Sequence, residues 1–393
     1  MDSSRNPRCV FYSHDTMGFG HIRRNMLLSQ SITAACPDAE ILLISGVREA
    51  GAFMLPPGAD SLILPSWQKT AEGKYHPRAL GKKVQPLVRL RSQIIYAAIN
   101  AFSPDIMIVD NVPRGAMREL DLSLPLLAAK KTHLVLGLRD ILDEPEAVKQ
   151  QWFKQENSTA LEKFYSSIWV YGDRSLYDLA REYHFDAATQ NKMIFTGYLD
   201  ATCRIQSFSH DEAAPVAQPY ALCVVGGGQD GFRLAESFVS TVLPNGMHGV
   251  LVTGSMMPEP QRLRLKKLAA AFPEKTVVEF VAEPLKLLRY ASRVIAMGGY
   301  NTLTELLAFN KTALIVPRVV PRKEQWIRAT KLAALGLIDA LHPDHLSPER
   351  LGDWLMQPRH FVNPREKLNF EGLEKVAASV RQILNGKRIG ECV

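Results

Sequence analysis

The chain has 393 residues, of which 46% are apolar and 22% charged, and its formal net charge is +7 at pH 7. This length exceeds the usual size of a single hydrophobic core, and the composition excludes a largely disordered chain. The modest positive charge suits an acidic ligand such as a nucleotide phosphate, but no dense Lys/Arg block is present, so we expect no nucleic-acid partner.

The cysteines and the apolar runs indicate the compartment. The five cysteines are scattered and lack any C-x-x-C spacing, which favours a reduced compartment and gives no support to a zinc site. The first residues are polar, and no window is apolar over the length of a membrane span. We expect a cytoplasmic protein. Peripheral membrane contact stays open, because the amphipathic stretch 85–100 could dock on a membrane or pack in the core.

Short β-rich runs alternate with helical patterns through the first half of the chain. Residues 24–34 and 84–101 carry helical periodicity. The runs that we expect to be strands are 9–12, 41–44, 106–109, 132–138, 167–171 and 193–195. Such alternation predicts a parallel sheet with helices on both faces.

A second series of the same kind follows residues 207–219, where Ser, Asp and Pro gather and periodicity is lost. Its expected strands are 220–225, 249–252, 277–281, 294–296 and 313–316. The sequence therefore predicts an α/β protein with two Rossmann-like, doubly wound domains facing across a cleft, over residues 1–206 and 220–365. Residues 366–393 are expected to form a helical tail that packs back on the first domain.

A glycine turn follows the first expected strand, in His14-Asp-Thr-Met-Gly-Phe-Gly-His-Ile-Arg-Arg24. Gly18 and Gly20 permit close backbone approach, and His21 falls near the start of the next helix. Because ligands of such folds bind at the carboxyl edge of the sheet, His21 could take a proton from an attacking hydroxyl. The alternative is a turn followed by an exposed or helix-capping histidine, and glycine spacing alone does not separate the two.

Three consecutive glycines open the second domain, in Val224-Val-Gly-Gly-Gly-Gln-Asp-Gly231. A glycine turn between a strand and a helix can cradle an anion with its backbone amides. No Gly-Lys-Ser/Thr follows and the dinucleotide fingerprint is incomplete, which disfavours a P-loop ATPase and an NAD enzyme. A tight turn without a ligand is the alternative.

The segment Ala296-Met-Gly-Gly-Tyr-Asn-Thr-Leu-Thr-Glu305 predicts a strand, a Gly-Gly turn and a helix start. Amides at this helix N-terminus would stabilise a departing diphosphate, and Glu305 could reach ribose hydroxyls. The rival interpretation is a capping box, in which Thr302 caps the helix and Glu305 only bonds the backbone. The continuation favours function, because a polar helix start at Glu324 would face the same cleft.

In combination, these motifs resemble the donor domain of the MurG-like N-acetylglucosaminyltransferases of peptidoglycan synthesis and their GT-B relatives. Four pieces recur in family order over residues 222–338: the glycine turn, a strand end at 279–281, the turn and helix at 298–305, and the helix start at 324–325. The resemblance implies that these pieces bind the base, diphosphate, ribose and sugar of a nucleotide-sugar donor. The residues that we assign to donor binding are Gly20, Gly227, Gly228, Gln229, Phe280, Val281, Gly298, Gly299, Asn301, Thr302, Glu305, Glu324, Gln325 and Arg328.

The first domain resembles the family less closely. Gly20-His21 matches the end of the family's glycine-rich turn. The pattern Gly18-x-Gly-His-x-x-Arg24 is also similar to the nucleotide-sugar hydrolases of nonulosonic acid synthesis, in which the matching histidine activates water. Arg328 stands where the transferases commonly have Asn, and the acceptor-side loops do not match. The resemblance therefore carries the donor chemistry but not the acceptor.

Two polar pairs follow strands of the first domain, Asp110-Asn111 and Arg139-Asp140. Either pair could line the acceptor side or supply a second base, and the alternative is a strand-end turn that satisfies its own amides. We take Asp140 as the second catalytic candidate beside His21.

The sequence thus predicts an inverting, metal-independent glycosyltransferase that uses a nucleoside-diphosphate sugar, with UDP the expected nucleotide. The acceptor is a hydroxyl of a sugar, a lipid-linked molecule or a small molecule, in the synthesis of a cell-envelope polysaccharide or glycoconjugate. No cofactor is expected, and no Asp-x-Asp pattern offers a metal site. The rivals are hydrolysis of the same donor and a non-enzymatic nucleotide-sugar sensor or scaffold. An epimerase of the donor is possible on the same architecture, but no motif points to it.

Overall fold

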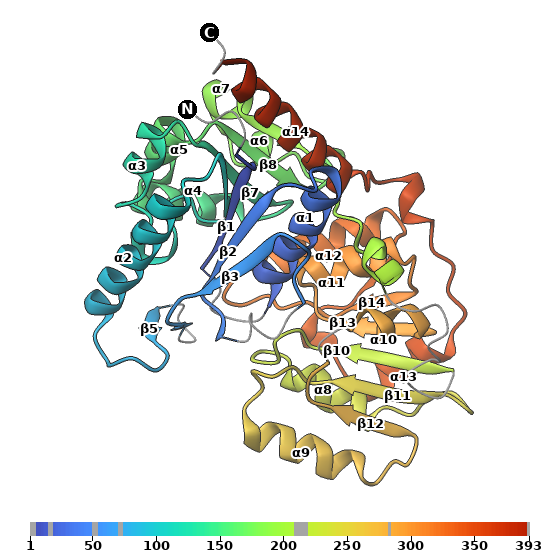
Figure 1. Cartoon of the computed structure of the whole chain (residues 1–393). Helices are drawn as coiled ribbons and strands as arrows, with labels where there is room; N and C mark the ends of the chain where they lie inside the picture. The colour runs from blue at the N-terminus through green and yellow to red at the C-terminus, as the bar shows by residue number, and fades with distance from the viewer. Residues whose placement is uncertain are drawn as a thin grey trace. The chain divides into compact units, whose positions relative to one another are not determined.

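The computed structural model describes residues 5–14, 19–48, 54–69, 74–207, 219–281 and 284–390. The chain divides into two compact units, Met1–Leu199 with Asn369–Val393, and Asp200–Leu368. Figure 1 follows the chain through both of them by colour. Of the predicted linker at 207–219, residues 208–218 lie outside the described part of the chain.

The first unit is built on a parallel sheet of seven strands in the order β3-β2-β1-β6-β7-β8-β9. The strands are β1 (Arg8–Ser13), β2 (Glu40–Ser45), β3 (Ala59–Ile63), β6 (Ile106–Asp110), β7 (His133–Arg139), β8 (Ser167–Tyr171) and β9 (Met193–Phe195). Every residue of β6 and β8 is buried, as expected where helices cover both faces of a parallel sheet. All six predicted strands are present. The edge strand β3 was not predicted.

Helices connect these strands, and the last helix of the chain returns to them. The helices are α1 (Gly20–Ala35), α2 (Val84–Phe102), α3 (Leu124–Ala129), α4 (Pro145–Gln155), α5 (Asn157–Phe164), α6 (Leu179–Glu182), α7 (Ala187–Asn191) and α14 (Gly372–Gly390). The short strand β4 (Trp67–Lys69) pairs antiparallel with β5 (Tyr75–Pro77). Helix α14 packs against α1, where Ser31 Oγ donates to the carbonyl of Leu373.

The second unit contains six parallel strands in the order β12-β11-β10-β13-β14-β15. They are β10 (Tyr220–Val224), β11 (His248–Val252), β12 (Lys275–Val278), β13 (Arg293–Ala296), β14 (Ala313–Ile315) and β15 (Asp339–Ala340). The helices are α8 (Phe232–Ser240), α9 (Glu259–Ala269), α10 (Leu285–Tyr290), α11 (Tyr300–Ala308), α12 (Glu324–Ala334) and α13 (Pro348–Met356). Apolar residues of α8, α9 and α13 pack on β10 and β11 in one buried cluster.

Both sheets share one topology. The first strand of each unit lies inside the sheet, with the second and third on one side and the fourth on the other. The strand order therefore reverses between β1 and β6, and again between β10 and β13. In open α/β sheets, ligands bind outside the carboxyl ends of the strands at such switch points. The predicted α/β class with two doubly wound parallel sheets is confirmed.

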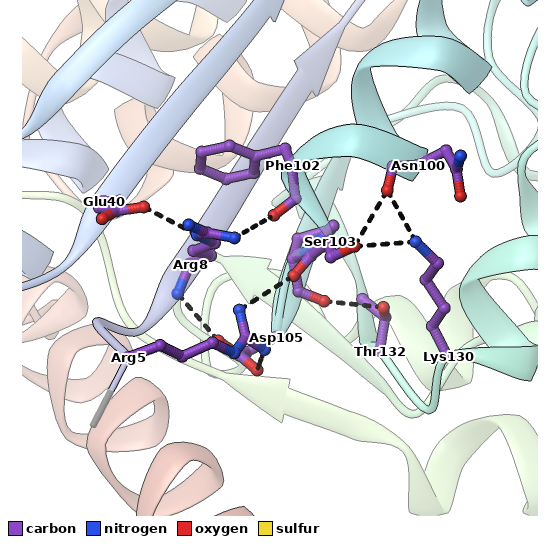
Figure 2. A network of polar contacts seen from close by, with 10 residues as sticks. Arg5, Arg8, Glu40, Asn100, Phe102, Ser103, Asp105, Lys130 and Thr132 are labelled. Carbon is purple, nitrogen blue, oxygen red and sulfur yellow. Dashed lines mark hydrogen bonds and ion pairs between the residues drawn. The ribbon is translucent and has the colours of Figure 1, made fainter. Parts of the chain in front are cut away.

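The amino edge of the first sheet is tied by polar contacts (Figure 2). The Arg8 guanidinium donates to Glu40 at 2.8 Å and to the carbonyl of Phe102 at 3.2 Å, which connects β1 with β2 and with the end of α2. Asp105 accepts from the backbone amide of Arg8 at 2.9 Å and from the Arg5 side chain at 2.7 Å. These contacts fix the entry of β1 between its neighbours, at the edge opposite to the switch-point loops.

Candidate functional site

His21 lies at the carboxyl end of β1, where the first sheet reverses its order. Helix α1 begins at Gly20 with Phe19 as its N-cap, so His21 is its second residue. Gly18 of the predicted turn lies outside the described residues. The His21 Nδ1 atom lies 3.2 Å from Oδ2 of Asp110, the last residue of β6. The His21 side chain is 19% exposed, whereas that of Asp110 is 2% exposed.

Arg24, one helical turn after His21, holds the same carboxylate. Its Nη2 lies 2.6 and 2.5 Å from the two oxygens of Asp110, and its side chain is 3% exposed. Burial by itself raises the pKa of Asp110, but the Arg24 guanidinium and then His21 outweigh it, so the net pKa lies below its ordinary range. Asp110 is therefore ionised near neutral pH.

An ionised carboxylate can only accept hydrogen bonds, so a hydrogen bond from His21 to Asp110 requires the hydrogen on Nδ1. The Nδ1 atom also lies 3.2 Å from Nη2 of Arg24, which can only donate. In the tautomer that donates from Nδ1 to Asp110, a lone pair is left on Nε2. An imidazole oriented in this way by a buried carboxylate can take a proton from a hydroxyl or from water at Nε2. In that tautomer, the arrangement at the first switch point suits a general base.

The partner of His21 is Asp110, although the sequence favoured Asp140 as the second catalytic candidate. Asp140 follows β7, one strand further from β1. Its carboxylate accepts from the Tyr198 hydroxyl at 2.9 Å and from the Ile141 amide at 2.8 Å. The Tyr198 contact connects Asp140 to the end of the segment Met1–Leu199 of the first unit. The signal for Asp110 was present in the sequence, as an acidic residue directly after a fully apolar strand.

In the second unit, the triple-glycine segment forms a turn between β10 and α8. Gly226 and Gly228 have φ values of +63° and +94°, which glycine adopts readily. A Cβ on Gly228 would lie 2.1 Å from the carbonyl oxygen of Thr253, in the loop after β11. The carbonyl of Gly227 accepts from the Met256 amide of the same loop. These glycines let two strand-end loops pack together, while Gln229 is exposed.

The second glycine turn, after β13, lies across the switch point from the first. Helix α11 begins at Tyr300 with Gly299 as its N-cap, and the first helical hydrogen bond runs from the Leu303 amide to the Gly299 carbonyl. The helix N-terminus, with its partial positive charge, therefore lies at the turn. The rival capping-box interpretation is wrong, because Thr302 is the third residue of the helix and cannot cap it.

Other predicted donor residues lie on α11 and just beyond β12. Asn301 and Thr302 are half-buried in the first turn of α11, and Glu305 is buried in the same helix. The predicted strand 277–281 ends earlier in the structure, because β12 ends at Val278. Residues 279–281 directly follow it. Phe280 is 44% exposed there and Val281 is half-buried.

The start of α12 packs against the turn at Gly298. A Cβ on Gly298 would lie 3.1 Å from the Cβ of Gln325, whereas a Cβ on Gly299 would meet nothing within 4 Å. Arg328, 1% exposed, donates from Nη1 to the Gly298 carbonyl at 3.2 Å. Because a trans peptide directs its C=O and N–H oppositely, this bond turns the Gly299 amide away from Arg328. Glu324 is also buried here.

The donor residues that the sequence predicted in the second unit therefore lie at the carboxyl ends of β10, β12, β13 and β14, on one edge of the sheet. Sequence reasoning missed Arg318, which bonds Asp230 and Glu324 at this edge. Among the described residues, no group of three or more His, Cys, Asp or Glu side chains is arranged to hold a metal ion. None of the described helices is long and apolar enough to cross a membrane.

Comparison with known proteins agrees with this architecture. No protein-family model matches the chain. A protein of Methanosarcina mazei described as an uncharacterized glycosyltransferase is 21% identical over 237 residues, 56% of this chain and 55% of its own. A protein of Methanosarcina acetivorans with the same description is 20% identical over 233 residues. The chain thus spans about half the length of the curated relatives it matches.

Solved structures match over nearly the whole chain. The glycosyltransferase of kitacinnamycin aligns with a TM-score of 0.58 at 15% identity, covering 97% of this chain and 95% of its own. MurG of Acinetobacter baumannii aligns at 0.59 and 12% identity, covering 96% and 99%. The MnaA–UDP co-structure from S. aureus aligns at 0.64 and 9% identity, covering 97% of both chains. With its two parallel sheets, the chain has the GT-B glycosyltransferase fold.

Proposed function

We propose that this protein is an inverting glycosyltransferase that transfers a sugar from a nucleoside-diphosphate donor to a hydroxyl acceptor without a metal ion. The observation that carries the proposal is the contact of 3.2 Å between His21 Nδ1 and the buried, ionised Asp110. A buried carboxylate that orients a partly exposed imidazole is an arrangement suited to proton abstraction.

The donor belongs to the second unit in this proposal. The diphosphate binds at the N-terminus of α11, in the open space beside Gly299. The helix dipole and the backbone amides of this turn stabilise the negative charge that develops as the diphosphate leaves. Glu305 takes the ribose and Gln325 the sugar hydroxyls. The co-structure of the similar MnaA protein with UDP makes UDP the first nucleotide to test.

His21 acts on the acceptor in this proposal. Its Nε2 atom removes the proton from the acceptor hydroxyl, and the resulting oxygen nucleophile attacks the anomeric carbon on the face opposite to the diphosphate. Asp110 stabilises the imidazolium that forms, and Arg24 keeps Asp110 ionised. Configuration at the anomeric carbon is thereby inverted.

Hydrolysis of the same donor is the second candidate. The observation in its favour is the Gly20-His21-x-x-Arg24 segment, in which Arg24 and His21 both contact Asp110, because the same base could activate water. The two activities differ only in the nucleophile that His21 deprotonates.

The test begins with a thermal-shift screen of the purified protein against nucleotide sugars and their free nucleotides. A ligand at a hundred times its dissociation constant should stabilise the fold by about 2.7 kcal/mol. Breakdown of the selected donor is then measured with and without candidate acceptors, in the presence of EDTA. Acceptor-dependent, EDTA-resistant release of nucleotide supports transfer, whereas equal release without acceptor supports hydrolysis. Binding without turnover would identify a sensor, and the absence of any binding would reject the proposal.

A further inference from the structure

Arg318 connects the two sides of the switch point in the second unit. It lies in the loop between β14 and α12, and its side chain is 19% exposed. Its Nη1 donates to Asp230 Oδ2 at 2.8 Å, in the glycine turn after β10. Its Nη2 donates to Glu324 Oε1 at 2.8 Å, at the first residue of α12. One planar guanidinium thus joins the triple-glycine turn to the helix that packs on Gly298.

The same residue fixes the amide of Gln325. The backbone N–H of Arg318 donates to Gln325 Oε1 at 3.0 Å. A backbone N–H can only donate, so the atom that it contacts must be the amide oxygen. One lone pair of this oxygen is thereby occupied, and the NH₂ group lies on the other branch of the amide. The NH₂ group of Gln325, a residue that is 9% exposed, can only donate, which suits the oxygen atoms of a sugar.

Arg318 also balances the charge of this edge. Glu324 is 4% exposed, and its Oε2 has no hydrogen-bond partner in the described part of the chain. Burial lowers the pKa of Arg318, but Glu324 and Asp230 outweigh this effect and the net pKa is raised. Without the guanidinium, two carboxylates would remain at the edge where a diphosphate is expected, and Glu324 would be buried without a counter-charge.

We propose that Arg318 is a positioning residue for the sugar of the donor, which it controls by holding Glu324 and Gln325 in place against the Gly298 turn. This inference rests on the proposed function. A nucleotide sugar that binds more tightly than its free nucleotide gains additional binding free energy from its sugar. Arg318 contributes to this additional part. The guanidinium fork is essential for this role, because an ammonium group presents a point charge and cannot span two carboxylates in a fixed plane.

The experiment compares Arg318→Lys and Arg318→Met with the wild-type protein by isothermal titration calorimetry. The probes are UDP, GDP, ADP and dTDP, each paired with its glucose conjugate, together with UDP-N-acetylglucosamine. The control is Arg264→Met, which removes one positive charge from a residue of α9 whose side chain is 67% exposed and paired with Glu236. Melting temperatures establish that each variant is folded.

For the pair that the wild-type protein binds, we expect Arg318→Lys to weaken the nucleotide sugar about tenfold, which corresponds to about 1.4 kcal/mol, and to leave the free nucleotide within about twofold. Arg318→Met should weaken both ligands, because it also leaves Asp230 and Glu324 without a counter-charge. In Arg318→Met, the further change Asp230→Asn should recover part of the affinity for the free nucleotide but not the preference for the sugar.

Two results would overturn the inference. In the first, Arg318→Lys keeps the wild-type ratio of affinities for the nucleotide sugar and the free nucleotide. In the second, it weakens both equally, which a merely structural role or a direct phosphate contact would produce. If the wild-type protein binds none of the probes, the proposed function fails together with the inference. If the wild-type protein binds a probe but Arg318→Lys gives either of the two results above, only the inference fails.

Discussion

Replacing Asp110 by Asn separates the structural and the chemical roles of the buried carboxylate. The carboxylate is bonded through both oxygens to Arg24, whose side chain is 3% exposed, and it also contacts His21. Asn keeps the shape but removes the charge, so the guanidinium of Arg24 is left buried without a counter-ion. Breaking a buried pair in this way costs about 3–5 kcal/mol. We therefore expect Asp110→Asn to lower the free energy of unfolding by that amount.

The matched variant is His21→Gln, which leaves the pair of Arg24 and Asp110 intact. Its free energy of unfolding should stay within about 1 kcal/mol of the wild-type value, since the His21 side chain is partly exposed, although its Nδ1 contacts both Asp110 and Arg24. Turnover of the donor should fall roughly 10²- to 10⁴-fold in both variants, because one loses the base and the other its orientation.

Urea unfolding and steady-state kinetics, measured on the same preparations, provide the test. The reasoning about the ion pair is refuted if Asp110→Asn is as stable as the wild-type protein. The reasoning about the base is refuted if His21→Gln retains near-normal turnover. A third variant, Asp110→Asn with Arg24→Met, removes both charges and should be less destabilised than the sum of its single changes, because neither charge remains buried alone.

Four further predictions concern stability and the glycine turns. The pKa of Asp110 is depressed in the folded protein. The ionised carboxylate therefore stabilises the fold at pH values above its unfolded pKa of about 3.9, and this stabilisation is lost as the pH falls towards the folded pKa. Below about pH 3.9, urea midpoints should drop more steeply in the wild-type protein than in Asp110→Asn. Gly298→Ala should lower the melting temperature, because its methyl would press on Gln325 at 3.1 Å. Gly299→Ala should leave the melting temperature unchanged and weaken nucleotide binding about tenfold, because its methyl would enter open space at the start of α11. Gly228→Ala should unfold at a clearly lower urea concentration, because its Cβ would lie 2.1 Å from a backbone carbonyl at a φ of +94°.

The sequence predicted the strands whose residues are apolar on both faces. β1, β6 and β8 read as unbroken hydrophobic runs because helices cover both sides of them. The strand β3, with the sequence Ala-Asp-Ser-Leu-Ile, lies at the sheet edge and is only partly buried. It therefore lacks the run that marks a central strand. The two residues of β15 are too few to form a pattern.

The pairing of His21 with Asp110 could not be predicted, because His21 begins the helix after β1 and Asp110 ends β6, and these two strands become neighbours only in the folded sheet. Asp110 ends one buried strand and Asp140 follows another, and nothing in the sequence ranked Asp110 above Asp140. The order of the sheet puts β6 beside β1 and β7 one position further. The sequence at Thr302 and Glu305 matches the capping-box pattern, but Thr302 does not cap the helix. The Gly-Gly turn ends earlier than the pattern requires, and the helix starts at Tyr300.

The return of α14 to the first unit determines how this protein can be dissected. The second unit is one uninterrupted segment, Asp200–Leu368, whereas the first needs both Met1–Leu199 and Asn369–Val393. A gene fragment that ends near residue 199 would leave the face of α1 that contacts α14 exposed to water, and we expect it to aggregate. A fragment limited to Asp200–Leu368 loses no strand of its sheet, so the half proposed to bind the nucleotide could be produced and titrated by itself.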